Sequence, residues 1–123
     1  MPDQNIYEGE FRNDKFHGVG KMTYVREGFS FECIYRSGFA SNIGRAVYKR
    51  DGSIYIGELN EDLKKHGCGV YIDGSTGRRY EGEFEDDVSQ GQGRIIFSSG
   101  SVYCGGVSKM MRQGAGKMEF KDP

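Results

Sequence analysis

The chain repeats itself. An aromatic residue, a variable residue and a small residue recur every 23 to 25 positions, and the five aromatic anchors are Tyr7, Phe31, Tyr55, Tyr80 and Tyr103. A second motif, Gly-x-Gly, follows each anchor, and only the second copy departs from it, with Asn42 and Gly44. Two motifs that stay in phase over five copies indicate a repeat protein, in which each copy is one unit of supersecondary structure.

Within each copy, aromatic and glycine residues alternate with polar ones. In the first copy Tyr7, Gly9 and Phe11 fall on one parity, whereas Glu8 and Glu10 fall on the other. A period of two is typical of a β-strand with one packed face and one polar face. The Gly-x-Gly half alternates in the same way, after a short polar connector. Each copy is therefore predicted to form a β-hairpin.

Turn signals separate the copies, at Asp51-Gly52, Asp73-Gly74 and Ser99-Gly100. Such dipeptides end one strand and begin the next. Successive hairpins are therefore expected to join edge to edge in a long antiparallel meander. Helix is disfavoured, because each glycine in a helix costs about 1 kcal/mol relative to alanine.

Glycine is the compositional outlier, at 20 of 123 residues, while the chain has only two prolines, Pro2 and Pro123. This composition is typical of neither collagen nor a disordered linker. We expect aromatic rings to lie over the bare glycine backbone of neighbouring strands, which gives a thin but dense sheet interior. The glycines assigned a structural role are Gly9, Gly18, Gly20, Gly57, Gly67, Gly69, Gly82, Gly91, Gly93, Gly105, Gly114 and Gly116.

The pattern Y-x-G-x-F…H-G-x-G, followed by an aromatic residue and a turn glycine, resembles the MORN repeat (membrane occupation and recognition nexus). The resemblance covers residues 6–120 and implies an all-β fold, an elongated and twisted antiparallel meander sheet of tandem hairpins. The expected repeat boundaries are 6–29, 30–53, 54–78, 79–101 and 102–120, with tails at 1–5 and 121–123.

Some copies depart from the family pattern. The second copy has Phe31, Cys33, Ser41 and Asn42 where tyrosine, glycine, histidine and glycine are usual. We therefore expect locally irregular packing there. The third copy carries one extra residue between Leu59 and His66. Copies four and five have Gln90 and Gln113 in place of histidine.

The resemblance implies a non-enzymatic scaffold or adaptor, without a cofactor, that docks a helix or extended segment of a protein partner. A cytoskeletal or ciliary assembly is the expected setting, and a homodimer is left open. The bare sheet edges at both ends suggest a subunit of a larger assembly or part of a longer protein. The candidate partner-binding residues are Tyr7, Phe11, Tyr24, Tyr55, Tyr80, Phe84, Phe97 and Tyr103.

Charge is nearly balanced, with 17 basic and 18 acidic residues, so the basic excess of a nucleic-acid binder is missing. One alternative is a membrane-surface adaptor that binds anionic lipid through basic residues, namely Lys64, Lys65, Arg78 and Arg79. Another is an accessory module of a larger enzyme, because MORN arrays precede such domains.

No catalytic or metal site is predicted. His17 and His66 occupy equivalent repeat positions, which favours hydrogen bonding to a turn over zinc binding. Cys68 lies close to His66 in sequence but has no evident third partner for nucleophilic catalysis. The cysteines are three in number and widely spaced, which is typical of free thiols in a reducing compartment. We therefore expect a cytoplasmic protein.

Overall fold

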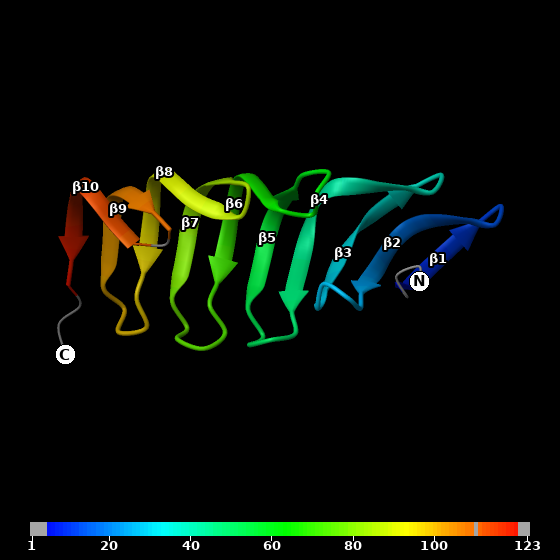
Figure 1. Cartoon of the computed structure of the whole chain (residues 1–123), viewed down its shortest axis with the longest axis horizontal. Helices are drawn as coiled ribbons and strands as arrows, with labels where there is room; N and C mark the ends of the chain where they lie inside the picture. The colour runs from blue at the N-terminus through cyan, green and yellow to red at the C-terminus, as the bar shows by residue number, and fades with distance from the viewer. Residues whose placement is uncertain (1–4, 110, 121–123) are drawn as a thin grey trace.

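The computed structural model describes residues 5–109 and 111–120, and these form one open antiparallel sheet of ten strands (Figure 1). Spatial order follows chain order from β1 to β10, so the expected all-β meander is confirmed. The strands are β1 (Ile6–Arg12), β2 (Lys15–Tyr24), β3 (Phe29–Arg36), β4 (Phe39–Tyr48), β5 (Ile54–Leu59), β6 (Lys65–Ile72), β7 (Arg79–Glu85), β8 (Val88–Ile96), β9 (Val102–Ser108) and β10 (Met111–Glu119).

The strands pair as five hairpins laid side by side along one long axis (Figure 1). The boundaries expected for the five copies stay predictions. Of the expected tails, residues 1–4 and 121–123 lie outside the described residues.

Two-residue turns close most of the hairpins. Asn13-Asp14 and Asp86-Asp87 have positive φ at both positions, with values of 51° and 62° in the first and 46° and 72° in the second. This is the type I′ geometry, whose twist matches that of the two strands it joins. The third hairpin is different, because its turn runs from Asn60 to Lys64. The extra residue of that copy lies in this longer turn.

In the four copies whose first motif begins with tyrosine, the tyrosine ring is packed over two glycines. A Cβ built at Gly93 would lie 2.5 Å from Cε1 of Tyr80, and one built at Gly82 would lie 2.5 Å from the Tyr80 hydroxyl oxygen. The Tyr80 hydroxyl then donates a 2.9 Å hydrogen bond to the carbonyl of Glu83, three residues further along its own strand. Tyr7, Tyr55 and Tyr103 make the same bond, at 2.8, 2.8 and 2.9 Å.

The first glycine of Gly-x-Gly has a different role. Gly18, Gly67 and Gly91 have φ values of 70°, 68° and 86°, and strand register shifts beside them. Such an irregularity bends the strand and increases its local twist. The backbone is in the left-handed region at this point, which glycine adopts more readily than other residues.

Burial divides the sheet into two faces. The aromatic face carries the core residues Phe29, Phe31, Cys33, Tyr35, Ala46, Tyr55, Leu59, Tyr80, Phe84, Ile95, Tyr103 and Val107. The opposite side, called the outer face below, carries Glu8, Lys21, Glu32, Arg45, Glu81 and Arg94. The molecule is therefore a single sheet whose core is its own layer of rings.

Candidate functional site

The structure places the eight candidate partner-binding residues in different environments. Tyr55 and Tyr80 are 0% exposed and Phe84 and Tyr103 are 5% exposed. The Phe84 ring contacts the ring of Tyr80 in its own strand and that of Tyr55 in the preceding hairpin. In this conformation these four residues offer a partner almost no surface. Phe11 is 62% exposed, whereas Tyr7, Tyr24 and Phe97 are partly buried. Partner contact stays a prediction for the residues that keep exposed surface.

Cations also lie on the aromatic face, which sequence reasoning did not predict. Lys65 Nζ lies 4.6 Å from the ring centre of Tyr48, 5.0 Å from that of Tyr71 and 5.8 Å from that of Tyr55. It also lies 3.5 Å from a carboxylate oxygen of Asp87. Burial lowers the pKa of Lys65, and the Asp87 carboxylate partly offsets this effect. Phe97 likewise lies under the guanidinium groups of Arg78 and Arg112.

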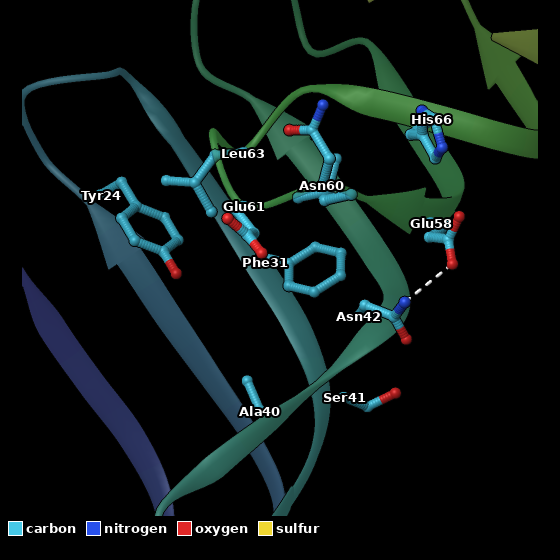
Figure 2. Close-up of a pocket in the computed structure, with 11 residues that line it drawn as sticks. Tyr24, Phe31, Ala40, Ser41, Asn42, Glu58, Asn60, Glu61, Leu63 and His66 are labelled. Atoms are coloured by element: carbon cyan, nitrogen blue, oxygen red, sulfur yellow. Dashed lines mark hydrogen bonds between the residues drawn. The ribbon is translucent and has the colours of Figure 1, made fainter. Parts of the chain in front are cut away.

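A pocket of about 480 Å³ opens between the second and third hairpins (Figure 2). Its lining comes from β2 to β6 and from the long turn: Tyr24, Phe31, Ala40, Ser41, Asn42, Glu58, Leu59, Asn60, Glu61, Leu63 and His66. In Figure 2, Glu61 and Leu63 reach from the turn toward Tyr24 and Phe31. The pocket opens on the side of the sheet that carries the buried ring of Phe31.

Two local features of the sequence produce the pocket. Ala40 presents only a methyl group at a position where the first hairpin has Phe16, whose ring stacks on Tyr7 at 3.8 Å. Elsewhere the turn of one hairpin donates a backbone hydrogen bond to the preceding hairpin. Gly38 donates to the Phe16 carbonyl, Asp87 to that of Lys65 and Lys109 to that of Ser89, at 2.8 to 3.0 Å.

The long turn at 60–64 makes no such bond to Ala40 in the described part of the chain. Its own side chain shapes it instead, because Asn60 Oδ1 accepts hydrogen bonds from the amides of Asp62 and Lys64. Asn60 Nδ2 also donates to Asp86 in the next hairpin, at 3.0 Å. The turn is therefore held toward the fourth repeat and leaves the space above Ala40 open.

The polar groups of the pocket include two carboxylates, Glu58 and Glu61, and one histidine, His66. Asn42 Nδ2 donates a 2.7 Å hydrogen bond to Glu58 Oε1, which joins the second hairpin to the third. Glu61 is exposed at the mouth. With Tyr24, Phe31 and Leu63 as apolar walls, the pocket combines aromatic surface with two carboxylates. That combination suits a side chain with an apolar stem and a cationic end.

The diverged second copy explains part of this arrangement. Phe31 has the buried position of the motif tyrosine but no hydroxyl group, and Cys33 takes the place of the glycine that follows two residues later in the other copies. Both residues are buried, and burial raises the pKa of the Cys33 thiol. The copy still forms a pair of strands, β3 and β4, whose register shifts between Cys33 and Tyr35.

The outer face has its own exposed surface. Cross-strand pairs of opposite charge run along it, including Glu8 with Lys21 at 3.9 Å and Glu81 with Arg94 at 3.6 Å. The row is interrupted by an apolar patch, in which the side chains are 46% to 61% exposed: Val19, Ile34, Ile43 and Ile56. This patch was not predicted from the sequence, where these residues fall on the polar parity.

Three of the four basic residues considered for lipid binding have partners within the chain. Lys65 contacts Asp87 and three rings, Arg78 lies over Phe97, and Arg79 pairs with Glu81 at 2.8 Å. Lys64 is exposed in the long turn. The four residues therefore do not form an exposed basic patch of the kind that attracts anionic lipid.

The sequence features considered for chemistry are separated in space. Cys68 is exposed and is a free thiol, and His66 contributes to the pocket. His17 lies in another part of the sheet, beside Arg12 and Lys15. Within the described residues, no three histidine, cysteine or acidic side chains gather in a metal-binding arrangement. The described residues form no helix that is long and apolar enough to cross a membrane.

Comparison with known proteins assigns the family. The sequence model of the MORN repeat matches residues 7–27, 55–78 and 80–102, together more than half of the chain. Alsin of Homo sapiens and of Pan troglodytes is 31% identical to the chain in an alignment of 117 residues that covers 90% of the chain. Alsin of Mus musculus is 32% identical in an alignment of 114 residues that covers 88% of the chain. The chain spans about 7% of the length of these relatives. With matched segments that coincide with three of its five hairpins, the chain belongs to the MORN repeat family.

Proposed function

We propose that this chain is a non-enzymatic scaffold or adaptor whose aromatic face docks a helix or an extended segment of a protein partner. MORN repeats form a non-catalytic module that mediates interactions with proteins or membranes. The observation that carries the proposal is the pocket between the second and third hairpins. It opens between two hairpins and presents Tyr24, Ala40 and Leu63 to a side chain from outside.

The setting of this interaction is also part of the proposal. We place the chain in the cytoplasm, as a subunit of a cytoskeletal or ciliary assembly, because MORN arrays recur in such assemblies. A single-layer sheet suits this role, since it offers a long surface with little mass behind it. Its partner is expected to run across several strands, so that several repeats contribute to binding.

Site-specific photo-cross-linking tests the docking surface directly. A photoreactive phenylalanine analogue is introduced at Phe11 or Leu63 on the aromatic side, and at Ile34 or Ile56 on the outer face as the matched control. All four side chains keep exposed surface, so the fold is expected to survive each replacement. After irradiation in native extract, cross-linked proteins are identified by mass spectrometry.

The proposal expects one protein to be captured from both aromatic-side positions and not from the outer face. It also expects purified partner and purified chain to reproduce the cross-link. Capture of a protein from Ile34 and Ile56 alone would contradict docking on the aromatic face. A cross-link from Ile34 or Ile56 to a second copy of the chain would identify a homodimer instead. Sedimentation with anionic vesicles tests the lipid alternative, and no salt-sensitive binding is expected.

A further inference from the structure

One position on the aromatic face is filled differently in each hairpin. It is the residue of the second strand that pairs with Phe11, Tyr35, Leu59, Phe84 and Val107 of the first strand. The residues at this position are Phe16, Ala40, Lys65, Ser89 and Arg112. In the third and fifth hairpins it is therefore a cation.

The third hairpin shows what the surroundings of this position can hold. Lys65 Nζ lies over the rings of Tyr48 and Tyr55 and 3.5 Å from the carboxylate of Asp87, in the turn of the next hairpin. The Lys65 side chain is only 13% exposed. Arg112 repeats part of this arrangement, with its guanidinium carbon 5.9 Å from the ring centre of Phe97. The fold thus already contains a lysine held by aromatic rings and a carboxylate.

One repeat earlier, the same surroundings lack the cation. Tyr24 and Phe31 take the places of Tyr48 and Tyr55, and Ala40 takes the place of Lys65. In the turn that follows, Leu63 takes the place of Asp87, and Glu61 of the same turn supplies a carboxylate. Together these groups line the pocket. The pocket therefore keeps the places of two of the three rings around Lys65, has Ala46 in the place of Tyr71, and lacks the lysine.

We propose that this pocket receives a basic side chain, lysine or arginine, from the segment of the protein partner. The inference rests on the proposed function and adds the chemistry of the side chain that is recognised. Its apolar stem would lie along Tyr24, Phe31 and Leu63, and its charge would face Glu58 and Glu61. The described lining contains these two carboxylates and no lysine or arginine.

Other side chains fit the lining less well. A purely apolar side chain would cover the Glu61 carboxylate without giving it a hydrogen-bond partner, which is costly. An acidic side chain would face two carboxylates, and like charges repel. A basic side chain satisfies both the rings and the acids, as Lys65 does one repeat later.

Four blocked pentapeptides test the proposal against the whole chain. Their sequence is acetyl-Ala-Ala-X-Ala-Ala-amide, where X is lysine, arginine, norleucine or glutamate. Amide chemical shifts of the chain are followed as each peptide is added. The lysine and arginine peptides are expected to shift the amides around Ala40, Glu58 and Leu63 in a saturable way. Equal binding of the norleucine peptide, or shifts located elsewhere, would overturn the proposal.

Three variants sharpen the test. Ala40→Lys supplies the cation from within the chain, as in the third hairpin, and is expected to abolish binding of the lysine peptide. Glu61→Gln is expected to weaken binding roughly three- to fivefold, which is the range of a partly exposed ion pair. Glu32→Gln, on the outer face, is the matched control and is expected to leave binding unchanged. An unchanged affinity in both pocket variants would also overturn the proposal.

The outcome is separable from that of the proposed function. If the peptides fail to bind while Phe11 and Leu63 still cross-link to a partner, the proposed docking on the aromatic face stands. The inference that the pocket binds a basic side chain is then wrong. If the lysine peptide binds while cross-linking captures nothing from the aromatic side, the pocket chemistry is correct and the scaffold role is wrong. The spectra of the variants also report whether each remains folded.

Discussion

The tyrosine hydroxyl gives the repeat its internal hydrogen bond. In four hairpins this hydroxyl reaches over glycine and donates to a carbonyl three residues on, at the point where strand register shifts. A buried carbonyl without a partner costs free energy, so the hydroxyl compensates for the irregularity of the strand. This is a physical reason for tyrosine, and not phenylalanine, at the motif position.

We expect Tyr80→Phe to lower the free energy of unfolding by about 1 kcal/mol, the usual net contribution of one hydrogen bond. The ring would stay in place over Gly93, so only the bond to the Glu83 carbonyl is lost. Tyr80→Ala should cost about 3–5 kcal/mol, because it also leaves a cavity. Urea denaturation followed by circular dichroism measures both values.

Tyr48→Phe is the matched control for this prediction. The Tyr48 hydroxyl is buried and has no hydrogen-bond partner among the described residues. Removing an unsatisfied polar group is expected to be neutral or stabilising. An equal loss of stability in Tyr48→Phe and Tyr80→Phe would show that the hydroxyl group, and not its hydrogen bond, is what matters.

Gly93→Ala tests the close approach of ring and backbone. A Cβ at this position would lie 2.5 Å from Cε1 of Tyr80, whose ring is fully buried and has little room to move. We expect a loss of about 2 kcal/mol in the free energy of unfolding, as for other overpacked cores. Gln92→Ala, one residue earlier and exposed, should change stability by less than about 0.5 kcal/mol. Similar values for both variants would argue against the packing described here.

The hairpins differ in how firmly each is joined to the next. The pairing of β4 with β5 extends over Ile43–Val47, and the backbone bond found at other junctions is missing between Ala40 and the long turn in the described residues. In a repeat protein each unit contacts only its neighbours, so a weaker junction lowers the local opening free energy.

Native-state hydrogen exchange is therefore expected to be faster for amides that join β4 to β5 than for those that join β6 to β7. Mass spectrometry or NMR measures this under conditions in which the chain stays folded. Replacing Asn42 with alanine should widen the difference, because it removes the side-chain bond to Glu58. Uniform exchange along the sheet would show that the open junction has no effect on local stability.

Most of the strands and hairpins could be predicted from the sequence, because the strand period, the turn residues and the phase of the repeats are all local signals. The hairpins, their order and the irregular second copy were expected. Exposure was harder to predict, since it depends on which ring of a neighbouring hairpin covers a given residue, as Phe84 covers Tyr55. The burial of Lys65 could not be predicted from the sequence for the same reason. An alignment of the repeats places Lys65, Phe16 and Ala40 at the same position, and the small Ala40 at that position is the signal that could have located the pocket.

The whole molecule has an unusually large surface for its mass. Its accessible surface is 8254 Å², whereas a globular protein of 13.8 kDa has about 6,600 Å². A single sheet cannot cover both of its faces, and buried tyrosine rings form part of its core, namely Tyr35, Tyr55, Tyr80 and Tyr103. Stability therefore depends on keeping these phenol groups neutral, because an ionised phenol is costly to bury.

Alkaline pH provides a test of this dependence. Burial raises the pKa of five tyrosines above 10.0, to about 12 for Tyr55, and the others are Tyr24, Tyr35, Tyr48 and Tyr80. Between the unfolded and folded pKa values the folded state binds more protons than the unfolded state, so stability falls as pH rises. Lys65 acts in the opposite direction, since its pKa is lowered in the folded state.

We expect the urea midpoint to fall as pH rises through 9 and 10 toward 12, because five phenols and the Cys33 thiol, whose pKa burial raises from 9.0, outweigh one amine. Tyr48→Phe should reduce the fall, whereas Lys65→Met should steepen it by removing the opposing group. Tyrosinate absorbance measured in parallel should rise together with unfolding. A midpoint that stays constant above pH 10 would mean that the rings are more hydrated than this packing allows.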